Sequence, residues 1–145
     1  MEAGELATLH ELCLEYVSTQ GLSRESFHEL WDEALPILRM GKRLEIEPPP
    51  VADTESFLGS GLEALEAVVL VAIGSFLADA LKMGLSKALE LLRDPVRRWR
   101  YVRTLGNLDG GQQERADAAL LWLPERWQEV EKLVRGGPDG RNAER

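Results

Sequence analysis

One long apolar stretch constrains the fold of this chain more than any other feature. The central stretch, residues 60–93, reads SGLEALEAVVLVAIGSFLADALKMGLSKALELLR. Ser60 and Glu63 are spaced as in a capping box, in which each side chain accepts a hydrogen bond from the other residue's backbone amide. We therefore expect a helix to begin at Ser60.

From Ser75 onward, polar residues of the central stretch form one narrow seam. Their spacing of four, three, four and four residues stacks them along a helix of 3.6 residues per turn. The members of the seam are Ser75, Asp79, Lys82, Ser86 and Glu90. A helix that is polar on only one thin stripe is predicted to be buried on most of its circumference, in a bundle, an oligomer interface or a lipid surface.

Length disfavours a helix that spans a membrane. The uncharged run at residues 67–78 has 12 residues, whereas a span needs about 18–20. A longer span would place Asp79 and Lys82 in hydrocarbon, where charges are costly.

Length also predicts a break in the helix. A straight helix over residues 62–92 would be about 46 Å long, whereas a compact domain of this size is somewhat under about 40 Å across. Gly74 and Gly84 are the candidate break points, because glycine costs about 1 kcal/mol against alanine inside a helix. Either glycine could instead mark a place where another helix presses on the backbone.

Size and cysteine content favour one cytoplasmic domain. The 145 residues are enough for a core, and we expect a single helical domain over residues 1–135. Cys13 is the only cysteine, which excludes an intrachain disulfide and fits a reducing compartment. The first residues show no secretion signal. Residues 136–145 lack apolar side chains for a core and are predicted to be a disordered tail.

Charge is unevenly distributed along the chain. The net charge is −8, and residues 1–60 hold 12 acids and 4 bases, whereas residues 61–145 hold 13 of each. Such asymmetry could provide an acidic face for a basic partner or mimic nucleic acid. We favour a solvated surface that keeps the protein soluble.

Two N-terminal helices are predicted to form an antiparallel hairpin. The first covers residues 3–20 and ends at Gly21 as a left-handed cap, and the second begins at Ser23. Pro36 is expected to kink or end the second helix near residues 32–35. The two apolar stripes are Leu6, Leu9, Cys13, Tyr16 and Val17, and Phe27, Leu30, Trp31, Ala34, Leu35 and Leu38.

The segment after this hairpin changes character. Residues 43–47, RLEIE, alternate as in a short edge strand, but no partner strand is visible in the chain. Three prolines at residues 48–50 favour extended polyproline structure. We interpret them as a stiff spacer rather than as a ligand for a proline-reading domain.

The C-terminal part is predicted to be helical. Asp94 and Pro95 form a strong helix start, and Gly106 a stop; a strand over residues 98–105 is the weaker alternative. The side chains expected to line one side of this helix are Val96, Trp99, Val102 and Leu105. Pro124 is expected to divide the heptad-like seam beyond it into two short helices or one kinked helix. That seam is Ala116, Leu120, Leu123, Trp127, Val130 and Val134.

No catalytic residue, cofactor or metal site is predicted. The Gly59–Ala64 segment fits a nucleotide-binding glycine pattern only on paper, because no strand precedes it and Glu63 would repel a phosphate. His10, Cys13 and His28 are three candidate ligands without the spacing of a zinc site. No serine or cysteine lies in a strained turn as a nucleophile would.

Five arginines surround two aromatic residues in one short segment. They are Arg93, Arg97, Arg98, Arg100 and Arg103, interleaved with Trp99 and Tyr101. This is the chemistry of a nucleic-acid contact, but these arginines spread around a helix, and the net charge opposes such binding. We expect them to pair with the acidic N-terminal helices, in the same chain or in a partner.

Together these patterns predict an all-α bundle of about five helices around a long apolar central helix. We expect a non-enzymatic interaction or adaptor protein that binds a protein partner or a second copy. The predicted contact residues are Val68, Val71, Ile73, Phe76 and Leu77, with Trp99, Trp122 and Trp127. Two alternatives are a peripheral membrane protein that lays residues 69–77 on lipid and a nucleic-acid-binding regulator. The second alternative would use Arg97, Arg98, Arg100 and Arg103.

Overall fold

A computed structural model describes residues 1–42, 44, 65–106 and 108–134. Across these ranges the chain forms seven α-helices and one 3-10 helix and no strand, which confirms the all-α prediction. The helices are α1 (Ala3–Thr19), α2 (Arg24–Arg39), α3 (Leu65–Met83), α4 (Leu85–Arg93), α5 (Pro95–Val102), α6 (Gly110–Trp122), η2 (Leu123–Arg126) and α7 (Trp127–Val134). The number exceeds five because Gly84 and Pro124 each divide a predicted helix.

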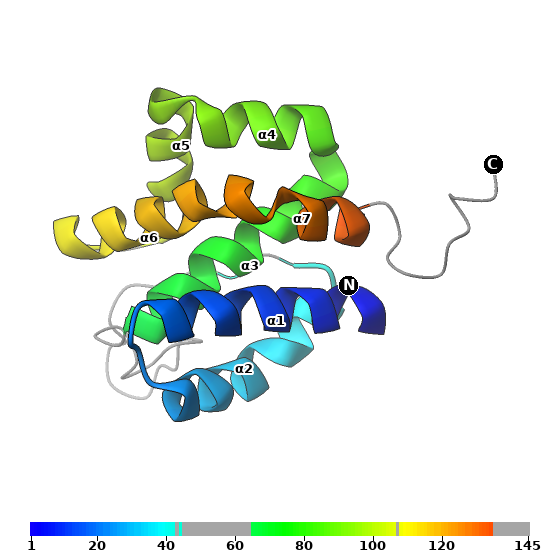
Figure 1. Ribbon diagram of the computed structural model, residues 1–145, viewed down its shortest axis with the longest axis vertical. Coiled ribbons are helices and arrows are strands. Elements are labelled where there is room, and N and C mark those ends of the chain that lie inside the picture. Colours follow the sequence, from blue (N-terminus) through cyan, green and yellow to red (C-terminus); the bar gives the residue numbers. More distant parts are fainter. Residues whose placement is uncertain (43, 45–64, 107, 135–145) are drawn as a thin grey trace.

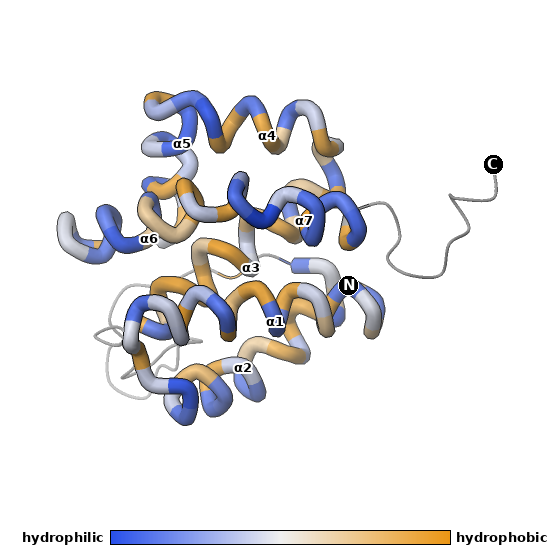
Figure 2. The backbone as a smooth tube through the Cα atoms, in the orientation of Figure 1, coloured by the Kyte–Doolittle hydropathy of each residue, from blue (hydrophilic) through white to orange (hydrophobic). Residues whose placement is uncertain are grey.

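Helix α3 runs through the middle of the molecule (Figure 1). The α1–α2 hairpin lies at one end of the long axis, α4 and α5 lie at the other, and α6 and α7 lie between them. Helices from both halves of the chain contact α3, namely α1, α2, α4, α6 and α7. Figure 2 shows that α3 is hydrophobic along nearly its whole length, as a helix surrounded by protein should be.

The turn between α1 and α2 lies where the sequence predicts. Gly21 has φ +69°, in the left-handed region, after the end of α1. The Ser23 hydroxyl caps α2 by accepting from the Ser26 amide at 3.1 Å. The Ser23 amide donates to Oε2 of Glu66 at 2.7 Å, which ties the start of α2 to α3. Since Glu66 is buried, this bond also satisfies its carboxylate.

Of the two outcomes expected at Pro36, a kink or an end of the helix near residues 32–35, the end is not found. The helix continues through Pro36 to Arg39, although an internal proline costs about 3 kcal/mol. Ala34 and Leu38, on either side of Pro36, are fully buried. Their packing favours a continuous helix and offsets the cost of the missing hydrogen bond.

The two glycines of the central stretch have different roles. Gly84, with φ +92°, separates α3 from α4, so α3 is only 19 residues or about 28 Å long. Gly74 lies inside α3, where an added Cβ would stand 3.1 Å from Cδ1 of Leu44. Gly84 is therefore the break, and Gly74 is a close-contact point, nearest to Leu44.

The polar seam of the central stretch does not face solvent at its start. The Ser75 hydroxyl is buried; it accepts from the Leu44 amide at 2.9 Å and donates to the Leu44 carbonyl. Asp79 accepts from the Tyr101 hydroxyl at 2.6 Å. The first two seam residues thus bind Leu44 and Tyr101, and only the later ones, Lys82, Ser86 and Glu90, are exposed.

Ser75→Ala is expected to lower the free energy of unfolding by about 2–4 kcal/mol. The substitution leaves the buried amide and carbonyl of Leu44 without their side-chain partner, and an unsatisfied buried group costs about 1–3 kcal/mol. Urea denaturation measures the change. Ser86→Ala, at an exposed serine of α4, is the matched control and should stay within about 0.5 kcal/mol of the parent. Equal midpoints for the two variants would contradict the role assigned to Ser75.

Local signals place the start of α5 correctly, but its buried face differs from the prediction. The Asp94 carboxylate accepts from the amides of Val96 and Arg97, as a cap before Pro95 should. Residues 98–102 are helical, so the strand alternative is wrong. The predicted side was Val96, Trp99, Val102 and Leu105, whereas the buried residues of α5 are Arg98, Tyr101 and Val102. Val96 and Trp99 face outward.

Pro124 divides the C-terminal seam as predicted. The 3-10 turn η2 contains Pro124 and joins α6 to α7.

Other predictions fall outside the described residues: the helix start at Ser60, the polyproline segment, the edge strand apart from Leu44, and the tail at residues 136–145. No helix in the described ranges is long and apolar enough to cross a membrane.

Candidate functional site

The predicted contact residues of the central helix lie in the core. They are Val68, Val71, Ile73, Phe76 and Leu77, each at most 1% exposed. The same burial covers the lipid-facing surface expected at residues 69–77. A partner or a lipid therefore cannot reach these side chains in this structure, and an interaction surface has to lie elsewhere.

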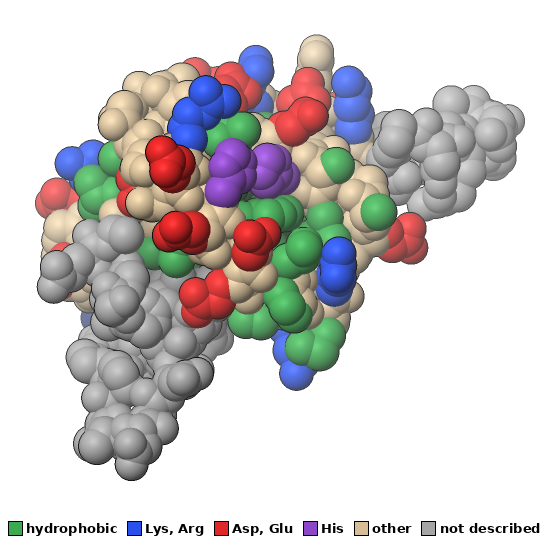
Figure 3. Space-filling model, turned by 90° about the horizontal axis from the view of Figure 1, so that it is seen from below, with side chains coloured by type: hydrophobic (Ala, Val, Ile, Leu, Met, Phe, Trp, Pro, Cys, Tyr) green, Lys and Arg blue, Asp and Glu red, His purple; other side chains and the backbone are tan. Residues whose placement is uncertain are grey.

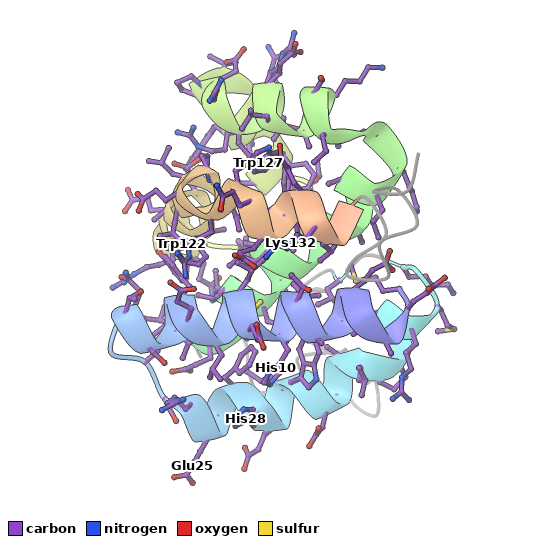
Figure 4. The ribbon with its side chains drawn as sticks, turned by 45° about the vertical axis from the view of Figure 1, so that its right-hand side comes forward. His10, Glu25, His28, Trp122, Trp127 and Lys132 are labelled. Carbon is purple, nitrogen blue, oxygen red and sulfur yellow. The ribbon has the colours of Figure 1, made fainter. Side chains whose placement is uncertain are left out.

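The three predicted tryptophans do not gather on one surface. Trp122 lies on the side of α6 toward α1, where its ring centroid is 5.1 Å from that of Tyr16. Trp127 points the other way, toward α4 (Figure 4). Trp99 lies on α5 and is 37% exposed. Trp122 and Trp127 are partly buried against the core, so Trp99 is the most accessible of the three.

The arginines near Trp99 differ in their surroundings. Arg98 is buried, with Nε donating to Oδ1 of Asp117 and Nη1 to the carbonyl of Leu92, both at 2.7 Å. Arg97 is exposed and pairs with Glu90 and Asp94 at 3.8 and 3.6 Å. Within the chain, then, these pairs join α4, α5 and α6.

The arginines of residues 93–103 were predicted to pair with the N-terminal helices, but neither Arg97 nor Arg98 does so. Arg126 of η2 instead makes a contact with α1, at 2.7 Å from Glu15. Arg98 is also unavailable to an outside anion. Arg100 of α5 and Arg103, the C-cap residue that follows it, remain exposed.

A groove between α1 and α2 was not predicted. Its volume is about 610 Å³. The lining residues are Met1, Ala3, Leu6, Ala7, His10 and Glu11 of the N-terminal segment and Trp31, Leu35 and Arg39 of α2. Most of these side chains are apolar, with Glu11 and Arg39 as the charged groups. Figure 3 looks at this end of the molecule, where hydrophobic side chains lie beside the two histidines and among acidic side chains.

The sequence contains a signal for this α1–α2 groove that is easy to overlook. Ala3, Ala7 and His10 are spaced by four and three residues, and Trp31 and Leu35 by four, so each set follows one helix face. The small alanines leave space opposite the larger side chains of α2. Ala3 and Ala7 lie next to the buried residues of α1 and so widen the apolar face of this helix.

Four rings form a cluster beside the groove. The His10 centroid lies 5.3 Å from that of His28 in a stacked pair, 5.0 Å from Trp31 and 5.5 Å from Phe27. Figure 4 shows the two histidines close together between α1 and α2. Burial is the main reason that the pKa of His10 is lowered, and His28 lowers it further, while Glu11 partly opposes both. His10 therefore favours its neutral form.

Acidification from about pH 7.5 to 5.5 is expected to lower the free energy of unfolding through His10. Its folded-state pKa lies below the unfolded value of about 6.5, so the unfolded chain binds the proton first as the pH falls. The stability that neutral His10 contributes is fully present above pH ~6.5. It is lost as the pH falls from there toward the folded-state pKa. Urea titrations at several pH values measure it.

His10→Gln should weaken this pH dependence. His28→Gln removes only the smaller coulombic influence and should keep most of it. If His10→Gln loses stability with acid as steeply as the parent, a different group is responsible.

The electrostatic surroundings of the groove are acidic. Residues 1–42 contain eight carboxylate side chains and three lysine or arginine side chains. At the groove itself the charged lining groups are Glu11, Arg39 and the Met1 ammonium group, which donates to the Leu38 carbonyl at 2.9 Å. A bound group that combines an apolar surface with positive charge would match both the lining and the surroundings.

The described residues provide no reactive centre at this groove. Cys13 is fully buried, and burial raises the pKa of its thiol, so it is a core residue. No group of three or more histidine, cysteine or acidic side chains in the described part of the chain is arranged to hold a metal ion. The arrangement can bind an apolar side chain between two helices.

Comparison with known proteins gives no further guide. No protein-family model, curated protein or solved structure matches the chain. The function has to be argued from the groove, its charge and the exposed surfaces.

Proposed function

We propose that this is a non-enzymatic adaptor protein that binds a helical protein partner in the α1–α2 groove. The observation that carries the proposal is an apolar groove of about 610 Å³ at the acidic end of the molecule. Grooves between two helices commonly receive the apolar face of a third helix. The acidic surroundings favour a partner helix with lysine or arginine beside its apolar residues.

The lining residues support a distinct role for each part of the groove. Trp31 and Leu35 offer large apolar surfaces, and both are only partly buried by the protein itself. Aromatic side chains that fill or line a desolvated pocket are frequent anchors of binding energy. Carboxylates around the pocket contribute to orientation and to the rate of association more than to affinity.

The proposed location is the cytoplasm. Cys13 is unpaired and buried in the core, a pattern typical of proteins in a reducing compartment.

A synthetic helical peptide with leucines on one face and lysines on the other is the probe for this proposal. We expect it to bind the protein, and we expect Ala7→Arg to weaken binding by at least about tenfold, or ~1.4 kcal/mol. Ala7 is exposed and lines the groove, so arginine there fills the space and repels the lysines without disturbing the core. Anisotropy of the labelled peptide measures the affinity.

Ala118→Arg is the matched control for this experiment. It makes the same replacement at an exposed alanine of α6, away from the groove, and should bind the peptide as the parent does. The proposal is wrong if the parent does not bind the peptide, or if both arginine variants bind it equally well.

A further inference from the structure

Helix α5 carries an exposed apolar surface. Four large hydrophobic side chains are exposed among the described residues, and two of them, Val96 and Trp99, belong to this helix of eight residues. They are 58% and 37% exposed and lie three residues apart, on one face. We call the surface formed by Val96, Trp99, Arg100 and Arg103 the α5 face. A single exposed apolar residue is ordinary, whereas an adjacent pair on a short helix indicates a contact surface.

The α5 face is basic, whereas the α1–α2 hairpin around the groove has more acids than bases. Residues 85–106 hold six lysines or arginines and two acids. Arg100 and Arg103 are exposed and follow Val96 and Trp99 by four residues each, so the two charges lie beside the apolar pair on the helix. The α5 face is therefore a basic, partly apolar helical surface, which is the partner chemistry that the groove favours.

The two surfaces lie at opposite ends of one molecule. The α1–α2 hairpin and α5 occupy the two ends of the long axis (Figure 1). A molecule cannot place its own α5 face in its own groove without unfolding. A neighbouring copy can do so.

We infer that the α1–α2 groove binds the α5 face of a second copy of this chain. The inference rests on the proposed function and names the partner of the same groove. Val96 and Trp99 of one copy enter between α1 and α2 of the next, against Ala7 and Trp31. Arg100 and Arg103 approach the carboxylates around the groove, with Glu11 the nearest lining acid.

Such a contact joins unlike surfaces, so it is heterologous. Because each molecule keeps a free groove at one end and a free α5 face at the other, the contact generates open chains rather than a closed pair. One groove and one short helix make a small interface, below about 1,200 Å² in total, as in weak and transient complexes. Association should therefore appear only at high protein concentration, and it should be weaker at about 1 M salt than at 0.1 M because charges are screened.

Light scattering of the full chain over a range of concentrations tests the inference. We expect the average mass of the parent protein to rise steadily with concentration. Two variants should remain monomeric: Ala7→Arg, in which the groove is blocked, and the double variant Val96→Glu/Arg100→Glu, in which the α5 face is altered. All three substituted positions are exposed, so both variants should fold, which unfolding midpoints verify.

Mixing the two variants is the decisive step. The groove-blocked variant keeps an intact α5 face and the α5 variant keeps an intact groove, so an equal mixture should form one-to-one dimers with twice the monomer mass. A parent that stays monomeric at every concentration overturns the inference. So does a mixture that stays monomeric while the parent associates, since association would then use other surfaces.

The peptide experiment separates this inference from the proposed function. Val96→Glu/Arg100→Glu should still bind the leucine–lysine peptide, because its groove is unchanged. If the peptide binds and the parent never associates, the groove is an interaction site for another partner and only the second-copy inference fails. If the peptide does not bind, the proposed function itself fails.

Discussion

Phe76→Asp is expected to abolish folding rather than to change assembly. The Phe76 ring is fully buried and meets Tyr101 edge-on at 5.8 Å between centroids. Removing a buried phenyl group costs about 3–5 kcal/mol, and an unpaired buried carboxylate adds several more. The new charge would also lie one helical turn from Asp79. The total approaches the whole stability of a typical domain, about 5–15 kcal/mol.

Circular dichroism and thermal unfolding measure this effect. We expect no cooperative transition and no near-ultraviolet signal for Phe76→Asp. Val96→Asp, the same acid at an exposed position of α5, is the control and should stay folded, within about 0.5 kcal/mol of the parent. A folded Phe76→Asp protein with an altered mass in solution would instead support the original prediction that the central helix is an interface.

Asp117→Ala is expected to cost about 3 kcal/mol. The Arg98 guanidinium is buried, and Asp117 is the carboxylate that the structure places on it, at 2.7 Å. Removing one member of a buried pair costs about 3–5 kcal/mol, because the other charge stays in a poor solvent. We expect the lower end of this range, because the Asp117 side chain is 23% exposed and water already reaches the pair. Urea denaturation measures the loss.

Two comparisons identify the cause of that loss. Glu129→Ala removes the acid of an exposed pair with Lys132, 4.0 Å long, and should cost no more than about 1 kcal/mol. The double variant Arg98→Met/Asp117→Leu removes both charges and should recover most of the stability, because apolar replacements of a buried pair are often neutral. If the double variant is as unstable as Asp117→Ala, the buried charge is not the source of the cost.

Local signals predicted the helix boundaries well. Gly21, Ser23, Gly84, Asp94 and Pro124 act within one or two turns of the backbone, so their effects are visible in the sequence alone. Pro36 is the exception. Its local cost is overcome by burial of the residues on either side, which depends on α1 and α3 and cannot be read from α2 itself.

The environment of the central helix could not be predicted from its own sequence. A helix that is apolar on nearly all sides needs cover, but the sequence does not say whether that cover comes from the same chain. Gly84 shortens the helix to about 28 Å, and α1, α2, α4, α6 and α7 of the same chain contact it. Of the environments expected from the apolar pattern, the bundle is the one found, and the pattern alone could not select it.

The candidate site was missed because it depends on relative helix positions. The groove exists only where the alanines of α1 face Trp31 and Leu35 across the hairpin. The exposure of Val96 and Trp99 depends on a rotation of α5 that places Arg98 and Tyr101 inward. The burial of Arg98 against Asp117 fixes that rotation, and such a buried arginine has no local signal in the sequence.

An NMR titration tests the central claim, that the groove and not the central helix binds partners. The leucine–lysine peptide is added to isotope-labelled Val96→Glu/Arg100→Glu protein, which we expect to be monomeric. We expect the amide shift changes to concentrate in residues 3–11 and 31–39, on the two sides of the groove. Changes centred on residues 67–80 of α3, or no changes at any residue, would contradict it.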